Sequence, residues 1–304
     1  MRCRRIQRGR GLRAPSWRRG AALLATTLAV LGAGVAWGGE LPSQLSSNWA
    51  GWVATAGGAS ARLDRHFIGI SATWVQPTAA CTPGRRAFAA FWVGLGGYST
   101  SSRSLEQVGT EADCSSRGQL FYYAWYELVP SPAVTIDKLR IGPGDEVAAH
   151  VHVSSDRVTV SIADLTSGAR PFELTKVMRR PGPDTSAAEW IAEAPSNCVS
   201  SRCTPLRLTD FGAVSFNDAT ASAIGSAGRH SGPICDPTWR QYGMIVLQRG
   251  TASDAGSGDR VAAEPTPLSA DGRSFSVAYG PTAATGSTRP CLATGPSGTT
   301  GATS

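Results

Sequence analysis

The stretch DEVAAHVHVSSDRVTVSIADL, residues 145–165, decides the fold class. In 145–153 and again in 157–165, nearly every second residue is apolar. A period of two is that of a β-strand with one buried face, because successive side chains point to opposite faces. Serine and aspartate residues separate the two runs, as is usual between strands. The stretch therefore predicts two β-strands joined by a polar turn.

The same pattern continues along the chain. No stretch of twelve or more residues carries a convincing helical stripe, and IGPGDE at 141–146 is a clear turn signal. Many short strands with polar turns predict an all-β sandwich or barrel in one domain. Further strands are expected at FIGISATWV (67–75), QLFYYAWYEL (119–128), AEWIAEA (188–194), YGMIVLQR (242–249) and SFSVAYG (274–280).

The two ends of the chain differ from the middle. Eight arginines in the first 20 residues precede an uncharged apolar run at 21–37, which predicts a secretory signal peptide over 1–39. A retained membrane anchor is the alternative. We expect a short spacer at 40–45, a folded domain at 46–280 and a disordered tail rich in Gly, Ser, Thr and Pro at 281–304. The polar stretch 250–272 is expected to be a surface loop.

The charge of the folded part argues against a nucleic-acid partner. Without the eight leading arginines, the formal net charge of +7 becomes −1 for the rest of the chain. Nucleic-acid binding needs a basic patch on the folded domain. After signal removal we expect a soluble, monomeric protein in the extracellular space, with no membrane partner.

Six cysteines remain beyond Cys3, and an even number in an exported chain indicates disulfides. No CxxC pair occurs that would favour a metal site. Six cysteines allow 15 pairings. We favour the sequential bridges Cys81–Cys114, Cys198–Cys203 and Cys235–Cys291.

Several familiar kinds of catalytic site fit the sequence poorly. The four histidines are not accompanied by a GxSxG serine elbow. His150 and His152 share a strand face, but a metal site needs a third ligand, so we expect no metal and no cofactor. Glycosidases need two carboxylates about 5–10 Å apart. Glu189 and Glu193 are about 13 Å apart on a strand, whereas Glu111 and Asp113 are closer and keep a glycan hydrolase as an alternative.

Six short motifs together resemble those of one known family, the glutamic peptidases or eqolisins. Their order and spacing are more specific than any one of them, and the resemblance covers roughly residues 46–280. The motifs are SSNWAGWV (46–53), FWVGLGG (91–97), LEQVGTEAD (105–113), YYAWYEL (122–128), AEWIAE (188–193) and LTDFGAVSFNDATA (208–221).

The resemblance implies a secreted acid endopeptidase that hydrolyses polypeptides. Its fold would be a sandwich of two antiparallel sheets of the jelly-roll or lectin-like kind. Matched by motif, the catalytic dyad falls on Gln107 and Glu189. The substrate groove is expected to hold Trp92, Trp125, Tyr126 and Glu127.

The sequence departs from the better-known fungal members at two positions. Gly96 and Tyr123 stand where those proteins carry aspartates that support the dyad. The departures leave the dyad in place and put its supporting hydrogen bonds in question.

A glutamine is chemically suited to pair with a glutamate in peptide hydrolysis. Glu189 can accept a proton from water and later pass it to the leaving amine. The Gln107 amide can stabilise the oxyanion without adding a negative charge that would raise the pKa of its partner. A secreted carbohydrate- or peptide-binding module, with Trp49, Trp92 and Trp125 stacking on the ligand, is the non-enzymatic alternative.

Overall fold

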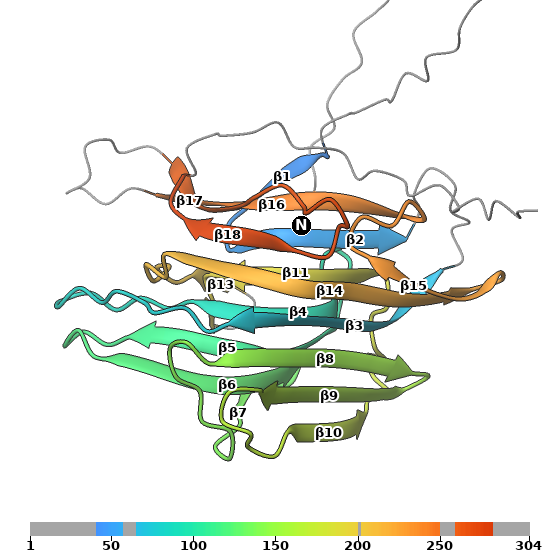
Figure 1. Cartoon of the computed structure of the whole chain (residues 1–304), viewed down its shortest axis with the longest axis horizontal. Helices are drawn as coiled ribbons and strands as arrows, with labels where there is room; N and C mark the ends of the chain where they lie inside the picture. Colours follow the sequence, from blue (N-terminus) through green and yellow to red (C-terminus); the bar gives the residue numbers. More distant parts are fainter. Residues whose placement is uncertain (1–40, 57–64, 200–201, 250–258, 282–304) are drawn as a thin grey trace, which may run out of the picture. The chain divides into compact units, whose positions relative to one another are not determined.

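The regular elements of the part of the chain that the structure describes are β-strands, and no helix occurs among these residues (Figure 1). The computed structural model describes residues 41–56, 65–199, 202–249 and 259–281. They belong to the unit Gly38–Ser304. The strands are β1 (Ser43–Ser46), β2 (Trp49–Ala56), β3 (His66–Val75), β4 (Ala90–Gly96), β5 (Leu105–Cys114), β6 (Leu120–Leu128), β7 (Val134–Thr135), β8 (Glu146–Ser154), β9 (Arg157–Asp164), β10 (Phe172–Val177), β11 (Ala187–Glu193), β12 (Ser196–Val199), β13 (Arg202–Pro205), β14 (Ala213–Gly225), β15 (Gly228–Pro233), β16 (Trp239–Arg249), β17 (Asp259–Pro265) and β18 (Phe275–Tyr279).

The strands form a sandwich of two antiparallel layers. The first layer has the order β10-β9-β8-β3-β14-β18, and the second has the order β16-β2-β11-β4-β5-β6-β7. β17 pairs with both β18 and β16 and so joins the layers at one edge. β3 packs across the sandwich on β4 and β11, and β8 packs on β4 and β5. The all-β sandwich expected from the sequence is confirmed.

The stretch that decides the fold class forms β8 and β9. They pair antiparallel from Val147↔Asp164 to Ser154↔Arg157, and Ser155 in the turn has a φ of 58°. Along β8 and β9 the alternate valines and isoleucine are buried, while the side chains between them are exposed or half-buried. The period of two in the sequence thus follows from one face packed on the core.

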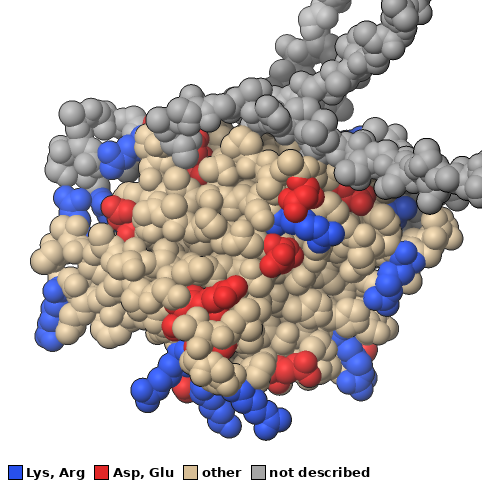
Figure 2. Space-filling model, in the orientation of Figure 1, with Lys and Arg blue, Asp and Glu red and all other residues tan. Residues whose placement is uncertain are grey.

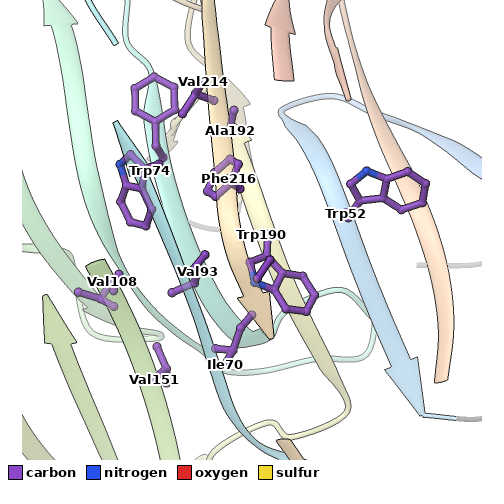
Figure 3. Packing of buried hydrophobic residues seen from close by; sticks show 14 of the residues in the cluster. Trp52, Ile70, Trp74, Val93, Val108, Val151, Trp190, Ala192, Val214 and Phe216 are labelled. Atoms are coloured by element: carbon purple, nitrogen blue, oxygen red, sulfur yellow. The ribbon is translucent and has the colours of Figure 1, made fainter. Parts of the chain in front are cut away.

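Large aromatic side chains fill the space between the layers (Figure 3). The indole N–H of Trp190 on β11 donates to the backbone oxygen of Ser71 on β3, at 3.0 Å. Trp74 on β3 donates to the hydroxyl of Thr110 on β5, at 3.1 Å. Each indole therefore links the two layers, and burial of so large a side chain contributes roughly 1.5–3 kcal/mol or more.

Two strands lie where the sequence predicted a spacer and a loop. β1 covers the second half of the predicted spacer and pairs parallel with β16. β17 lies within the predicted loop 250–272. β1 is an exposed edge strand, and the buried residues of β17 are the neighbours Ala262 and Ala263, so neither segment shows a period of two.

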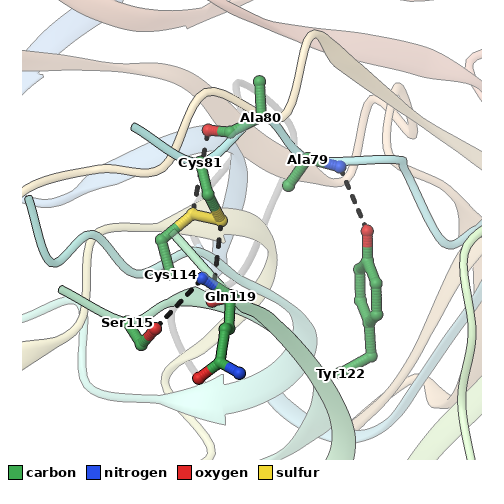
Figure 4. Close-up of a disulfide and its surroundings, with 7 residues drawn as sticks. All are labelled: Ala79, Ala80, Cys81, Cys114, Ser115, Gln119 and Tyr122. Atoms are coloured by element: carbon green, nitrogen blue, oxygen red, sulfur yellow. Dashed lines mark hydrogen bonds between the residues drawn. A yellow bond between two sulfur atoms is a disulfide. The ribbon is translucent and has the colours of Figure 1, made fainter. Parts of the chain in front are cut away.

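Two of the three favoured disulfides occur among the described residues. Cys81 is bonded to Cys114 at the end of β5, and Cys198 to Cys203 across the β12–β13 hairpin. Close to the first bridge, the backbone N–H of Ala79 donates to the hydroxyl of Tyr122 (Figure 4). The bridge and this hydrogen bond tie the segment before β4 to β5 and β6. The third predicted bridge includes Cys291, which lies outside the described residues, as do the predicted signal peptide and nearly all of the predicted tail.

On the face shown in Figure 2, lysines and arginines of the described residues are scattered and do not form one continuous patch. Membrane-spanning helices are not found among the residues described.

Candidate active site

One row of residues crosses four neighbouring strands of the second layer. Glu189 on β11 pairs with Gly94 on β4, Gly94 pairs with Gln107 on β5, and Gln107 pairs with Glu127 on β6. Cross-strand partners point to the same face of a sheet, and two strand spacings separate Glu189 from Gln107 by about 10 Å at the backbone. Gly94 has no side chain, and the Trp92 ring and the Gln107 Cβ lie next to the space that a side chain there would occupy.

A cleft of about 830 Å³ lies at the Gln107–Glu127 end of this row. Gln107, Glu127 and Trp125 line its floor, and Trp49 lines it near the start of β2. The loop 129–133 and residues of the β12–β13 hairpin form its walls. Glu189 is fully buried and is not among the residues that line the cleft.

The amide of Gln107 is held by one hydrogen bond and has further capacity. Its Nε2 donates to Oε2 of Glu127 at 2.7 Å, and its Oε1 is buried without a hydrogen-bond partner. A primary amide has two N–H donors and one carbonyl acceptor. One N–H thus fixes the orientation of the amide. The other N–H can donate a hydrogen bond to a bound molecule, and the carbonyl oxygen can accept one.

The carboxyl group of Glu189 has neither oxygen hydrogen-bonded and is completely buried. Burial raises the pKa of Glu189 well above its ordinary value, and the negative charges of Asp184 and Glu106 raise it further. A buried carboxylate without partners is a strong proton acceptor. It is suited to take a proton from a water molecule.

Asp184 reaches the end of β4 from the segment between β10 and β11. A Cβ atom on Gly96 would lie 2.5 Å from the Asp184 Cβ, so the Asp184 side chain occupies the space beside this glycine. Gly96 is one of the two positions at which the sequence departs from the fungal pattern. An aspartate is present here, but it comes from another part of the chain.

Three more carboxyl groups lie further along β5 and β11, those of Glu111, Asp113 and Glu193. Tyr123 donates to Asp113 at 2.9 Å, and burial together with the negative charge of Asp113 raises the pKa of the neighbouring Glu111. Trp92 and Asn48 donate to the two oxygens of Glu193 at 2.9 and 2.7 Å. Burial raises the pKa of Glu111 to about 8, of Glu193 to about 7 and of Asp113 to about 6.

The Glu111–Asp113 pair bears on the glycan-hydrolase alternative. Both residues lie on β5, as that alternative requires. A glycosidase needs two carboxyl groups about 5–10 Å apart on either side of one bound sugar. Glu111 lines the cleft and Asp113 does not, so the cleft does not present the two carboxyl groups together.

The predicted groove residues do not all reach the cleft. Trp125 and Glu127 line it, but Trp92 is fully buried beside it. The expectation for Tyr126 is wrong, because this ring points to the other face of β6, stacks on Phe172 and accepts a hydrogen bond from Lys176. Neighbouring residues on a strand point to opposite faces, so Tyr126 cannot share the cleft with the residues on either side of it.

His150 and His152 stack on each other on the first layer, with ring centroids 6.1 Å apart. Among the described residues, no group of three His, Cys, Asp or Glu side chains is arranged to hold a metal ion. Asp184, Glu106 and Glu193 were not singled out as site residues by the sequence. Asp184 lies in an irregular segment, and its contacts come from residues about 80 positions away, which leaves no local signal.

A sequence model of the Peptidase A4 family matches residues 47–257. The chain belongs to this family, the eqolisins or glutamic peptidases. It is a peptide-bond hydrolase. Among curated proteins, none matches the chain.

Solved structures of glutamic peptidases share the fold of this peptidase. Scytalido-glutamic peptidase, solved with a transition state analog inhibitor, superposes with a TM-score of 0.58 at 22% identity. SCP-B, a member of the eqolisin family solved with the tripeptide Ala-Ile-His, superposes with a TM-score of 0.53 at 22% identity. In each case the match covers 77% of this chain and 98% of the other.

Proposed function

We propose that the protein is a secreted acid endopeptidase that hydrolyses polypeptides with Gln107 and Glu189 as its catalytic dyad. The observation that carries the proposal is the register Glu189↔Gly94↔Gln107, with a glycine between the two side chains. Both side chains keep buried polar atoms without hydrogen-bond partners, and Gln107 lines a cleft that can receive an extended peptide. The protein acts as a monomer and needs no cofactor in this proposal.

Glu189 is the general base. Its ionised carboxylate takes a proton from a water molecule as the water oxygen attacks the carbonyl carbon of the scissile peptide. The protonated carboxyl group then donates that proton to the leaving amine, so Glu189 returns to its starting state. Proton transfer in both directions suits a carboxyl group with no competing hydrogen bond.

Gln107 orients the water and stabilises the oxyanion. Its Oε1, which has no partner, accepts a hydrogen bond from the attacking water. Its free N–H donates to the carbonyl oxygen on which negative charge develops, while Glu127 holds the other N–H. Because the amide stays uncharged at every pH, it adds no charge that opposes ionisation of Glu189.

The proposal makes a prediction for the Glu189→Gln variant. The variant removes the base and keeps the volume of the side chain, so hydrolysis of an unfolded protein substrate should be lost from pH 2 to 8 with little change in melting temperature. Glu173→Gln, at an exposed glutamate of β10, is the matched control and should keep full activity. Activity in Glu189→Gln equal to wild type, or a wild type that cleaves glycans and not proteins, would overturn the proposal.

Export is the second part of the proposal and gives a second prediction. Disulfides in the folded domain are typical of an oxidising compartment. An arginine-rich start and an apolar run precede that domain. Mass spectrometry of the exported protein should show that about 36 to 39 residues have been removed. A mature form that still begins at Met1 would favour a retained anchor.

A further inference from the structure

The carboxyl group of Asp184 is fixed in place by three donors. Its Oδ2 accepts hydrogen bonds from the hydroxyl of Ser102 and from the backbone N–H of Gly97, the latter at 3.4 Å. Its Oδ1 accepts from the backbone N–H of Ser186 at 2.9 Å. Burial alone would raise the pKa of Asp184, but the hydrogen bonds from Ser102 and Ser186 outweigh it and lower the pKa. Asp184 therefore stays ionised on the acid side of neutrality.

The register of β4 places this charge close to Glu189. Asp184 packs against Gly96, and Gly94, two residues earlier on the same strand, pairs with Glu189. Two residues along a strand span roughly 7 Å. Glu189 is completely buried, and neither of its oxygens has a hydrogen bond that would offset a nearby negative charge.

The other titratable groups around Glu189 are neutral or screened on the acid side. Glu106 on β5 accepts a hydrogen bond from the Asp184 backbone N–H, and burial raises its pKa to about 8. Glu193, four residues along β11, has a pKa raised by burial to about 7. Burial also raises the pKa of Glu127, beyond Gln107. On the β16 side, the same face carries Tyr242 and the exposed Arg240, whose charge is screened by solvent.

We propose that Asp184 is a positioning residue that keeps a fixed negative charge beside Glu189 and thereby sets the pH at which the peptidase gains activity. The inference rests on the proposed function, because it takes ionisation of Glu189 as the event that starts the reaction. The charge opposes that ionisation, so activity begins at a higher pH than it would without Asp184. In return, the ionised Glu189 is a stronger base.

The test compares the acid limb of kcat/KM for wild type and Asp184→Asn. Asparagine keeps an acceptor for Ser102 and removes the charge, so the midpoint of the limb should move to lower pH by about one unit. Asp137→Asn removes one charge from an exposed loop and should leave the midpoint unchanged. Asp184→Glu restores the charge and should return the midpoint towards the wild-type value. A merely structural defect would lower the activity at every pH without moving the midpoint.

A second variant keeps the inference testable if Asp184→Asn does not fold. Ser102→Ala removes the side-chain hydrogen bond that lowers the pKa of Asp184, and it should shift the limb in the same direction by a smaller amount. If Asp184→Asn folds and its midpoint equals that of wild type, the inference is overturned. If Asp184→Asn does not fold, an unchanged midpoint in Ser102→Ala overturns it.

Glu189→Gln, measured in the same assay, separates this inference from the proposed function. An inactive Glu189→Gln keeps the dyad even where the role of Asp184 fails, whereas an active Glu189→Gln overturns the dyad itself.

Discussion

At the scale of the residue, the orientation of Gln107 is set by its hydrogen bond to Glu127. Because Nε2 donates to Glu127, Oε1 on the other side of the amide is left without a partner. An isolated glutamine would lose rotamer freedom when it bound a transition state. Here the side chain is already ordered, which is the condition under which one hydrogen bond gives its full stabilisation.

Two substitutions of Gln107 test this role. Gln107→Ala removes the oxyanion donor, and kcat should fall by about 100- to 1000-fold, which corresponds to roughly 2.7–4 kcal/mol. Gln107→Glu keeps the size but puts a third carboxyl group between Glu127 and Glu189. Neighbouring carboxylates cannot all ionise, so the loss of activity in Gln107→Glu should grow as the pH rises above about 5.

The measurement is hydrolysis of an unfolded protein from pH 2 to 8, with melting temperatures to confirm folding. Equal activity of Gln107→Ala and wild type at every pH would show that the amide takes no part in the reaction. A loss in Gln107→Glu that does not depend on pH would contradict the role assigned to charge.

At the scale of the element, Gly94 makes β4 a spacer between the two catalytic strands. A Cβ atom at Gly94 would lie 2.9 Å from the Trp92 ring and 3.2 Å from the Gln107 Cβ. Trp92 is fully buried and donates to Glu193, so it has little room to move away. The absence of a side chain at Gly94 therefore positions both Gln107 and Trp92.

Gly94→Ala should reduce activity at least tenfold and destabilise the fold by about 1–3 kcal/mol, the usual cost of overpacking. The matched control is Gly142→Ala, whose Cβ would meet only a side-chain oxygen of Asp145 at 3.5 Å, and it should be nearly neutral. Enzyme kinetics and urea unfolding of both variants measure the two effects. A fully active Gly94→Ala would show that the gap over β4 is not needed.

Burial on one face explains which strands were predictable from the hydrophobic period. β8 and β9 have one buried face, and their period of two is visible in the sequence. β4 is buried along its whole length, because the core lies on one side of it and the aromatic residues under the cleft lie on the other. A strand buried on both faces loses its alternation, so it was identified only through the family motif.

The residues of the candidate site could likewise be predicted only in part from the sequence. Gln107 and Glu189 were assigned by resemblance to a family, since a single Gln or Glu on a strand has no local signature. The period of two was sufficient to separate Trp125 and Glu127 from Tyr126, and applying it would have corrected that expectation. The contact of Asp184 with Ser102 joins residues 82 positions apart, and only the folded chain brings them together.

At the scale of the whole molecule, buried carboxyl groups make stability depend on pH. Burial raises the pKa of six of them, including Glu127 and Glu189. In the other four of the six the raised pKa is about 8 for Glu106 and Glu111, about 7 for Glu193 and about 6 for Asp113. A pKa that is higher in the folded chain than in the unfolded chain means that the folded state holds the proton more tightly. Their contribution to stability is thus complete below about pH 4 and is lost as the pH rises through 6 to 8.

Other groups act in the opposite direction at lower pH. Hydrogen bonds lower the pKa of Asp184 and Asp236 despite their burial, so their contribution is present above about pH 4 and is lost as the pH falls through their folded-state pKa values. The two sets together place the maximum of stability at about pH 4 to 5. This range is more acidic than the pH 5 to 8 that is common for proteins.

We therefore predict that the melting temperature falls by roughly 10 °C or more between pH 5 and pH 8, which corresponds to a loss of several kcal/mol for a domain of this size. Glu111→Gln is uncharged at every pH and removes one of the four groups, so its melting temperature should fall less steeply over the same range. Thermal unfolding in buffers from pH 3 to 8 measures both curves. A wild-type melting temperature that stays level or rises from pH 5 to 8 would contradict the raised pKa values. A fall of this kind would also lower the activity on the alkaline side of the pH profile, because less of the enzyme stays folded there.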